Sequence, residues 1–305
     1  MNLNDLIKSN IAAGLSRPLA EARVCQDVIL SAIASGPLNR NVAIKGGVVM
    51  RSISRNLRRS TRDLDFDFIR YSLDDSAIES FIRKLNCIEG IEISIISGIE
   101  ELKHQDYHGK RVHISVSDEE GTVIKSKLDI GVHKHLEIEQ EDYCFDLCLN
   151  DGGASLLTNS KEQIFIEKLR SLLVFGPNSN RYKDVYDLYY LKEYTDIVKL
   201  NRIAGSLIFD DVLMRENTWE DVLRRISATF SDRTYVRHLS ESRQRWIDED
   251  LSEILSSLLV FFSELSKASP KYNGKLSVTA LEKRLSGLSP TGAFALVFNH
   301  SIEIM

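Results

Sequence analysis

The chain has 305 residues, of which 43% are hydrophobic and 27% charged, with 16 glycines and five prolines. This composition is typical of a soluble globular protein and excludes a disordered, collagen-like or low-complexity chain, while the length predicts one large or two modest domains. The formal net charge of −5 excludes a uniformly basic coat for nucleic acid, but it does not exclude a local basic patch.

The charge is unevenly distributed along the chain. Residues 1–70 carry a formal charge of +5, which leaves −10 for the remainder and predicts an anionic partner for the N-terminal part.

No segment holds the roughly 18 apolar residues of a membrane span, and the first ten residues lack the features of a secretory signal. The four cysteines form no Cys-x-x-Cys pair. We therefore expect free thiols, no membrane partner and a cytoplasmic location.

The first half of the chain has a mixed hydrophobic pattern. Helical spacing over residues 3–34 predicts helices, residues 41–44 predict a short strand, and Gly46-Gly47 ends that strand. A helix to about Asn56 should follow, and strict alternation from Asp63 to Ile69 predicts a second strand. Further along we expect a helix at 74–86 and strands at 91–99, 110–117, 121–132 and 143–149.

From Ser160 onward the pattern has the period of helices alone. Helices are expected at 160–175, 181–194, 197–208, 217–230 and 249–267. The turn residues 150–153 mark the change between the two patterns. We therefore predict an α+β protein. Residues 1–155 would form a domain with a small mixed sheet and flanking helices, and residues 156–305 a helical domain.

The most informative stretch is the alternating strand that begins at Asp63. Asp63, Asp65 and Asp67 share one face of this strand, with neighbouring carboxylates roughly 6.5–7 Å apart along it at about 3.3 Å per residue. Three ionised carboxylates this close repel one another, and a divalent cation with oxygen ligands, Mg²⁺ or Mn²⁺, would neutralise them. The alternative is an edge strand whose exposed face happens to be acidic.

Upstream residues favour the functional interpretation. Gly46-Gly47, between a strand and a helix, allows the backbone to approach a phosphate, and a helix N-terminus favours anions. Lys45, Arg51, Arg55 and Arg59 add positive charge, the three arginines along one stripe if the helix extends that far. A phosphate site beside metal-binding carboxylates is the arrangement of phosphoryl-transfer enzymes.

Two sequence blocks resemble a known family. Lys45-Gly46-Gly47 followed by Arg59-Ser60-Thr61-Arg62-Asp63-Leu64-Asp65-Phe66 is similar to the signature of the polymerase-β-like nucleotidyltransferases, and more narrowly to AbiEii/AbiGii-type toxins of abortive-infection and type IV toxin–antitoxin systems. The helical block of residues 167–172 and 181–189 matches that family's Lys, Arg and two Asp. One departure is Val48-Val49-Met50, where such toxins often carry Thr-Ala-Leu.

The resemblance assigns roles to individual residues. Asp63 and Asp65 would hold the metal with a third carboxylate, for which Asp129 on another alternating strand is the candidate, also as general base. Asp67 is then a bystander or a substitute ligand. Lys168 would contact nucleotide phosphates, and Asp184 or Asp187 would orient a basic partner. The catalytic set is Asp63, Asp65, Asp129, Lys168 and Asp187, and the nucleotide-binding set is Lys45, Gly46, Gly47, Arg59, Ser60, Arg181 and Asp184.

The function implied is Mg²⁺-dependent transfer of a nucleoside monophosphate from an NTP to an acceptor hydroxyl. The family makes the tRNA 3′ end the expected acceptor, growth arrest the outcome and a cognate antitoxin the partner. Alternatives are transfer to a protein hydroxyl, a nucleotide sensor without turnover, and a nuclease. For the helical block, the alternative is a pair of amphipathic helices with solvated surface charges.

Overall fold

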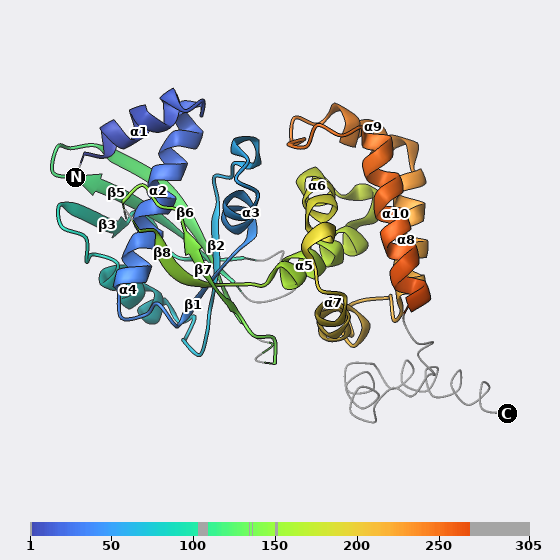
Figure 1. The fold of residues 1–305 in the computed structure, drawn as a ribbon. Helices are drawn as coiled ribbons and strands as arrows, with labels where there is room; N and C mark the ends of the chain where they lie inside the picture. The colour runs from blue at the N-terminus through green and yellow to red at the C-terminus, as the bar shows by residue number, and fades with distance from the viewer. Residues whose placement is uncertain (1, 103–108, 134, 136, 150–151, 269–305) are drawn as a thin grey trace. The chain divides into compact units, whose positions relative to one another are not determined.

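The computed structural model describes residues 2–102, 109–133, 135, 137–149 and 152–268. The chain divides into two compact units, an N-terminal unit to Ile164 and a C-terminal unit from Phe165. A mixed sheet with helices forms the first unit and helices form the second, which confirms the α+β class (Figure 1). Within the described residues, no helix is long and apolar enough to cross a lipid bilayer.

Eight strands of the described N-terminal unit form one sheet, in the order β3-β5-β6-β2-β1-β8-β7, with β4 paired to β5. Their bounds are β1 (Val42–Lys45), β2 (Leu64–Phe68), β3 (Ile91–Ile95), β4 (Glu100–Glu101), β5 (Lys110–Asp118), β6 (Val123–Val132), β7 (Glu141–Phe145) and β8 (Ala154–Thr158). The acidic strand β2 lies between β6, which is parallel to it, and β1, which is antiparallel. It is therefore a central strand, and the edge-strand alternative is wrong.

Helices cover one face of this sheet. The helices of the unit are α1 (Leu3–Ala12), α2 (Arg17–Ser35), α3 (Gly46–Ser54) and α4 (Asp75–Lys84), with a 3₁₀ turn η1 at Leu57–Arg59. Phe66 and Phe68 of β2 pack on Phe81 of α4, with ring centroids 5.5 and 5.1 Å apart. Since side chains alternate along a strand, the neighbouring aspartates point to the opposite face, away from α4.

The helix α3 is shorter than the sequence pattern predicts. It ends at Ser54 because Arg55 adopts a left-handed backbone conformation with φ of 51°. The predicted stripe of three arginines is therefore wrong. Arg51 is buried, Arg55 is exposed beyond the helix end, and Arg59 is buried on the 3₁₀ turn.

Arg51 belongs to a buried network that supports the loop before β2. Its guanidinium Nη1 donates to Gln26 Oε1 at 2.5 Å, and its Nη2 lies 3.6 Å from Asp27 Oδ1. The amide Nε2 of Gln26 donates to the carbonyls of Thr61 and Asp63, at 3.1 and 3.3 Å. Burial lowers the pKa of Arg51 to about 10, although Asp27 opposes the shift. The network ties helices α2 and α3 to the start of the acidic strand.

The described part of the C-terminal unit is helical. It contains most of α5 (Lys161–Phe175), then α6 (Tyr182–Leu191), α7 (Ile197–Ala204), α8 (Trp219–Ser231), α9 (Arg233–Glu241) and α10 (Leu251–Ala268), with short turns η2 (Gly176–Asn178), η3 (Lys192–Tyr194) and η4 (Gly205–Phe209). Trp219 stacks on Phe262, with centroids 6.3 Å apart, where α8 packs on α10. Helix α9 was not predicted because only Tyr235 and Leu239 of its residues are buried.

The cysteines provide a test of this packing. All four are free thiols, and burial raises the pKa of Cys25 to about 12, as burial and the nearby Asp27 do for Cys148. Cys25 is buried, whereas Cys87, Cys144 and Cys148 are exposed. We expect iodoacetamide in mildly alkaline buffer to alkylate Cys25 at least about a hundredfold more slowly than Cys87 and Cys144, because only the thiolate reacts and the Cys25 thiol is buried.

Peptide mass spectrometry after timed alkylation measures these rates. Guanidinium-unfolded protein is the control, in which all four cysteines should react alike. Equal rates for Cys25 and Cys87 in the native protein would contradict the packing of α2 against the sheet.

Candidate active site

A row of four charged side chains crosses the face of the sheet opposite to α4. Lys45 of β1 is the register partner of Asp65 of β2, Asp65 is the partner of Asp129 of β6, and Asp129 is the partner of Arg111 of β5. Register partners point to the same face of a sheet. The row therefore places two carboxylates side by side with a cation at each end.

Asp129 is held by its neighbour in this row. Arg111 donates from Nε and Nη2 to the two oxygens of Asp129, both at 2.7 Å, in a bidentate pair. The hydrogen bond to Asp129 is the main cause that raises the pKa of Arg111. Sequence reasoning identified Asp129 but missed Arg111, although it occupies an alternating polar position of a predicted strand.

The other two aspartates of the acidic strand have different cationic partners. Asp63 directly precedes β2 and is partly exposed. Its Oδ1 lies 2.9 Å from Nζ of Lys127. Asp67 is buried and lies 2.6 Å from Nζ of Lys45. A Cβ at Gly131 of β6 would collide with Asp67 Oδ1, so the glycine is needed for this close approach. The three aspartates are therefore not equivalent.

The N-terminus of α3 lies against Asp65. Gly46 has φ of +70°, and a Cβ there would lie 2.6 Å from Asp65 Oδ2. A Cβ at Gly47 would lie 2.8 Å from the side chain of Thr61. Both positions require glycine, and the first turn of the helix presents backbone N–H groups beside the carboxylate pair.

Two further predicted nucleotide-binding residues lie just upstream of β2. The Ser60 hydroxyl donates to the carbonyl of Leu57, and Arg59 is buried on the 3₁₀ turn. The Ser60 side chain thus supports the local turn. Arg55, Arg58 and Arg62, which flank them, are exposed.

The donor chemistry of this face suits a hard divalent cation. Asp65 and Asp129 present carboxylate oxygens at adjacent register positions, with Asp63 two residues earlier on the same face, and Mg²⁺ and Mn²⁺ prefer oxygen ligands. In the described part of the chain, no three acidic, histidine or cysteine side chains are already grouped as a metal site. Arg111 and Lys127 would have to leave Asp129 and Asp63 for these oxygens to bind a metal.

A second charged cluster lies in the C-terminal unit. Nζ of Lys168, on α5, lies 2.9 Å from Asp184 Oδ1 and 2.6 Å from Asp187 Oδ2, both on α6. Asp187 is fully buried, and the Lys168 side chain is only 11% exposed. Arg181, exposed at the start of α6, places Nε 3.5 Å from Asp184 Oδ2. The interpretation of these acids and this lysine as solvated surface charges is therefore wrong.

Sequence reasoning missed one residue of this cluster. The indole Nε1 of Trp246 donates to Asp187 Oδ1 at 3.0 Å. Trp246 precedes α10 and is 59 residues from Asp187 in the sequence, so no local pattern links the two.

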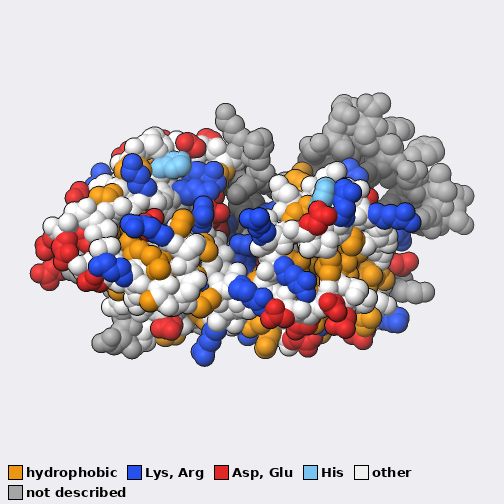
Figure 2. All heavy atoms as spheres, turned by 90° about the horizontal axis from the view of Figure 1, so that it is seen from above, with side chains coloured by type: hydrophobic (Ala, Val, Ile, Leu, Met, Phe, Trp, Pro, Cys, Tyr) orange, Lys and Arg blue, Asp and Glu red, His pale blue; other side chains and the backbone are white. Residues whose placement is uncertain are grey.

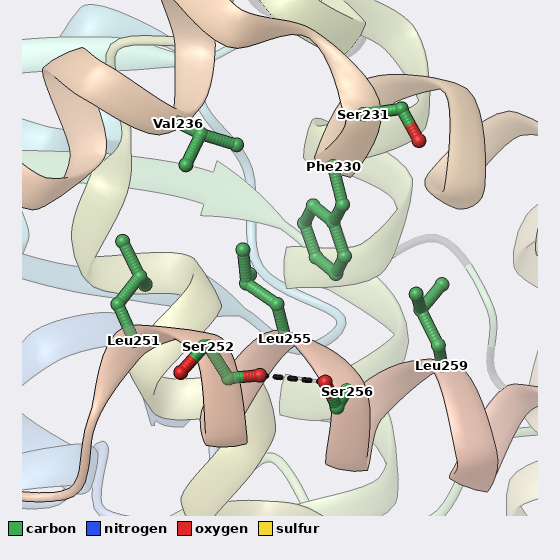
Figure 3. A pocket seen from close by; sticks show the side chains of 8 residues that line it. All are labelled: Phe230, Ser231, Val236, Leu251, Ser252, Leu255, Ser256 and Leu259. Atoms are coloured by element: carbon green, nitrogen blue, oxygen red, sulfur yellow. Dashed lines mark hydrogen bonds between the residues drawn. The ribbon is translucent and has the colours of Figure 1, made fainter.

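An apolar pocket in the same unit has a different character. It has a volume of about 330 Å³ and is lined by residues of α8, α9 and α10 (Figure 3). Its lining consists of Phe230, Ser231, Val236, Leu251, Ser252, Leu255, Ser256 and Leu259. None of these side chains is charged, so the pocket lacks the groups that phosphate or metal chemistry needs.

Comparison with known proteins places these features in a family. The model of the nucleotidyl transferase AbiEii toxin family, of type IV toxin–antitoxin systems, matches residues 28–262, a range that contains both charged clusters. A solved structure of an antigenic nucleotidyltransferase-like protein from Paracoccidioides brasiliensis is 16% identical, with 72% of this chain and 92% of that chain covered and a TM-score of 0.42. The search of curated proteins found no match.

The buried cluster makes a prediction for stability. Lys168→Met should lower the free energy of unfolding by about 3–5 kcal/mol, because it leaves Asp184 and Asp187 buried without their cation. Urea unfolding followed by tryptophan fluorescence reports on this unit, since Trp219 and Trp246 are the chain's two tryptophans.

The control is the same substitution at the exposed Lys267, in the last turn of α10, which should change stability by no more than about 0.5 kcal/mol. Equal midpoints for the two variants would show that Lys168 does not compensate buried charge.

Proposed function

Because the chain belongs to the AbiEii family of toxin nucleotidyltransferases, we propose that it transfers a nucleoside monophosphate from an NTP to the hydroxyl of a tRNA 3′ end. The observation that supports this most is the adjacent pair Asp65 and Asp129 beside the N-terminus of α3. Carboxylates for a metal and backbone donors for a phosphate are the two requirements of phosphoryl transfer.

In the N-terminal unit, we assign the metal ligands to Asp63, Asp65 and Asp129. Mg²⁺ or Mn²⁺ held there would polarise the α-phosphate and favour ionisation of the attacking hydroxyl. Asp129 accepts the proton of that hydroxyl as general base. The N–H groups at Gly46 and Gly47 bind phosphate oxygens of the NTP, aided by Lys45, Arg59 and Ser60.

In the C-terminal unit, we assign phosphate binding to Lys168. Its two buried acids, Asp184 and Asp187, orient the ammonium, because they accept two of its three donors. Arg181, next to Asp184, adds an exposed cation for the nucleotide. The helical domain of residues 156–305 therefore contributes to nucleotide binding in this proposal.

An RNA acceptor agrees with a local group of basic side chains on the N-terminal unit. Figure 2 shows Lys and Arg side chains grouped on the face of this unit that is seen from above. The exposed Arg55, Arg58 and Arg62 lie in the segment that leads from α3 to the acidic strand. Contacts to RNA phosphates supply affinity that falls as salt rises. Growth arrest, a cognate antitoxin and a cytoplasmic location complete the proposal.

The direct test is transfer of radioactive label. Purified protein with total tRNA, Mg²⁺ and each α-³²P-labelled NTP in turn should label tRNA with one or two nucleotides. Asp65→Asn should abolish labelling, because it removes a charged metal ligand, while Glu89→Gln, at an exposed carboxylate of the same unit, should not. EDTA should abolish labelling by the wild type.

Each other outcome contradicts the proposal in a distinct way. Label on protein would identify a protein-modifying transferase, and shortened RNA without label a nuclease. Stoichiometric NTP binding without release of pyrophosphate would identify a nucleotide sensor.

The close contact at Gly46 makes a second prediction. Gly46→Ala should reduce transfer at least about a hundredfold, because the new methyl group displaces the Asp65 carboxylate and small displacements of reacting groups cost this much. Gly121→Ala is the matched control, since Gly121 also has a positive φ, of +84°, but has no atom near its missing Cβ.

Both alanine variants should lose about 1–2 kcal/mol of stability from the left-handed backbone. Activity measured at a temperature where both are folded then isolates the effect on Asp65. Full activity of Gly46→Ala would refute this placement of the carboxylate.

A further inference from the structure

Asp187 is held at both of its carboxylate oxygens. Oδ2 lies 2.6 Å from Nζ of Lys168, and Oδ1 accepts the indole N–H of Trp246 at 3.0 Å. Asp187 has no exposed surface, so bulk solvent does not reach either contact. Two side chains that orient this carboxylate therefore come from different segments, one from α5 and one from outside both α5 and α6.

Trp246 is itself rigidly placed in the connection between α9 and α10. Its side chain is buried, and the centroid of its ring lies 5.5 Å from the centroid of the Tyr190 ring on α6. Its neighbour Arg245 fixes the connection by donating to three backbone carbonyls at 2.9, 2.8 and 2.7 Å, those of Ile247, Asp248 and Glu249. A connection fixed in this way can position a side chain as firmly as a helix does.

The bond between Trp246 and Asp187 has a consequence for Lys168. A buried indole N–H needs an acceptor, and a carboxylate acceptor gives a stronger, charge-assisted bond. Because the indole fixes Oδ1, it also fixes the rotation of the carboxylate and therefore the direction in which Oδ2 points toward the ammonium of Lys168. Without the indole, the carboxylate could rotate and the ammonium could follow it.

We propose that Trp246 is a positioning residue for nucleotide binding, which acts by fixing Asp187 and, through it, the ammonium of Lys168. This inference rests on the proposed function of Lys168 as the residue that contacts the nucleotide phosphates. It extends the nucleotide site to a third segment of the C-terminal unit, which no sequence motif marks.

The chain offers a matched control for the test. Trp219 is equally buried, and its Nε1 also donates to a side-chain oxygen, but this oxygen is Oδ1 of Asn201, at 2.6 Å, which is not a member of the lysine cluster. Trp246→Phe and Trp219→Phe each remove one buried indole bond. A purely structural role predicts the same result for both variants.

The expected result is a separation of KM from kcat. Trp246→Phe should raise the KM for NTP about tenfold with kcat within about twofold of wild type, because a loosened phosphate contact weakens substrate and transition state alike. Trp219→Phe should leave both constants within about twofold. Unchanged KM in Trp246→Phe, or an equal rise in both variants, would overturn the inference.

A second measurement needs neither catalysis nor a variant that folds poorly. In ¹⁵N-labelled wild-type protein, Mg²⁺ and a mixture of the four α,β-methylene nucleoside triphosphates should shift the indole N–H signal of Trp246 but not that of Trp219. If this shift occurs while labelling of RNA and protein fails, the proposed transfer is wrong and the inference stands. Transfer without a selective Trp246 shift overturns the inference alone.

Discussion

Compensation of negative charge on a central strand is the constraint on which the N-terminal unit depends. β2 has a neighbouring strand on each side, and Phe66 and Phe68 are buried on the face opposite to its aspartates. The aspartates therefore do not lie at a solvated edge of the sheet. Lys127 lies near Asp63, and Lys45 lies near Asp67. On the neighbouring strand β6, Arg111 pairs with Asp129 in the same way. These ion pairs offset the repulsion between the carboxylates. A divalent cation can compete with the lysines and the arginine for the carboxylate oxygens.

The charged cluster of the C-terminal unit has the opposite arrangement, with a cation at its centre. Here one buried cation, Lys168, is surrounded by acids, and the excess negative charge is reduced by Arg181 near Asp184 and by the indole dipole of Trp246 on Asp187. Removing Lys168 leaves two buried acids without this cation, and removing the indole of Trp246 leaves Asp187 Oδ1 without that donor. A buried charge that loses its partner is far more costly than the net gain from the intact pair.

Sequence patterns predicted what depends on local spacing and missed what depends on pairing between distant segments. Alternation placed the aspartates of β2 on one face, and the family motifs located Lys168 and Asp187. Arg111 and Trp246 could not be predicted, because strand register brings one to Asp129 and tertiary packing brings the other to Asp187. The arginine stripe failed because a left-handed residue, Arg55, ends α3 early. Strand β8 was missed because its five residues precede a strong helical pattern.

The position of Trp246 along the chain has a consequence for synthesis. During translation a chain emerges from its N-terminus and folds in units as they become available. Lys168 and Asp187 leave the ribosome long before Trp246, which follows Asp187 by 59 residues. Until that later segment emerges, the carboxylate of Asp187 lacks its bond from the indole. If Trp246 positions Lys168 as proposed, the nascent chain acquires full nucleotide binding only after these 59 further residues have been made.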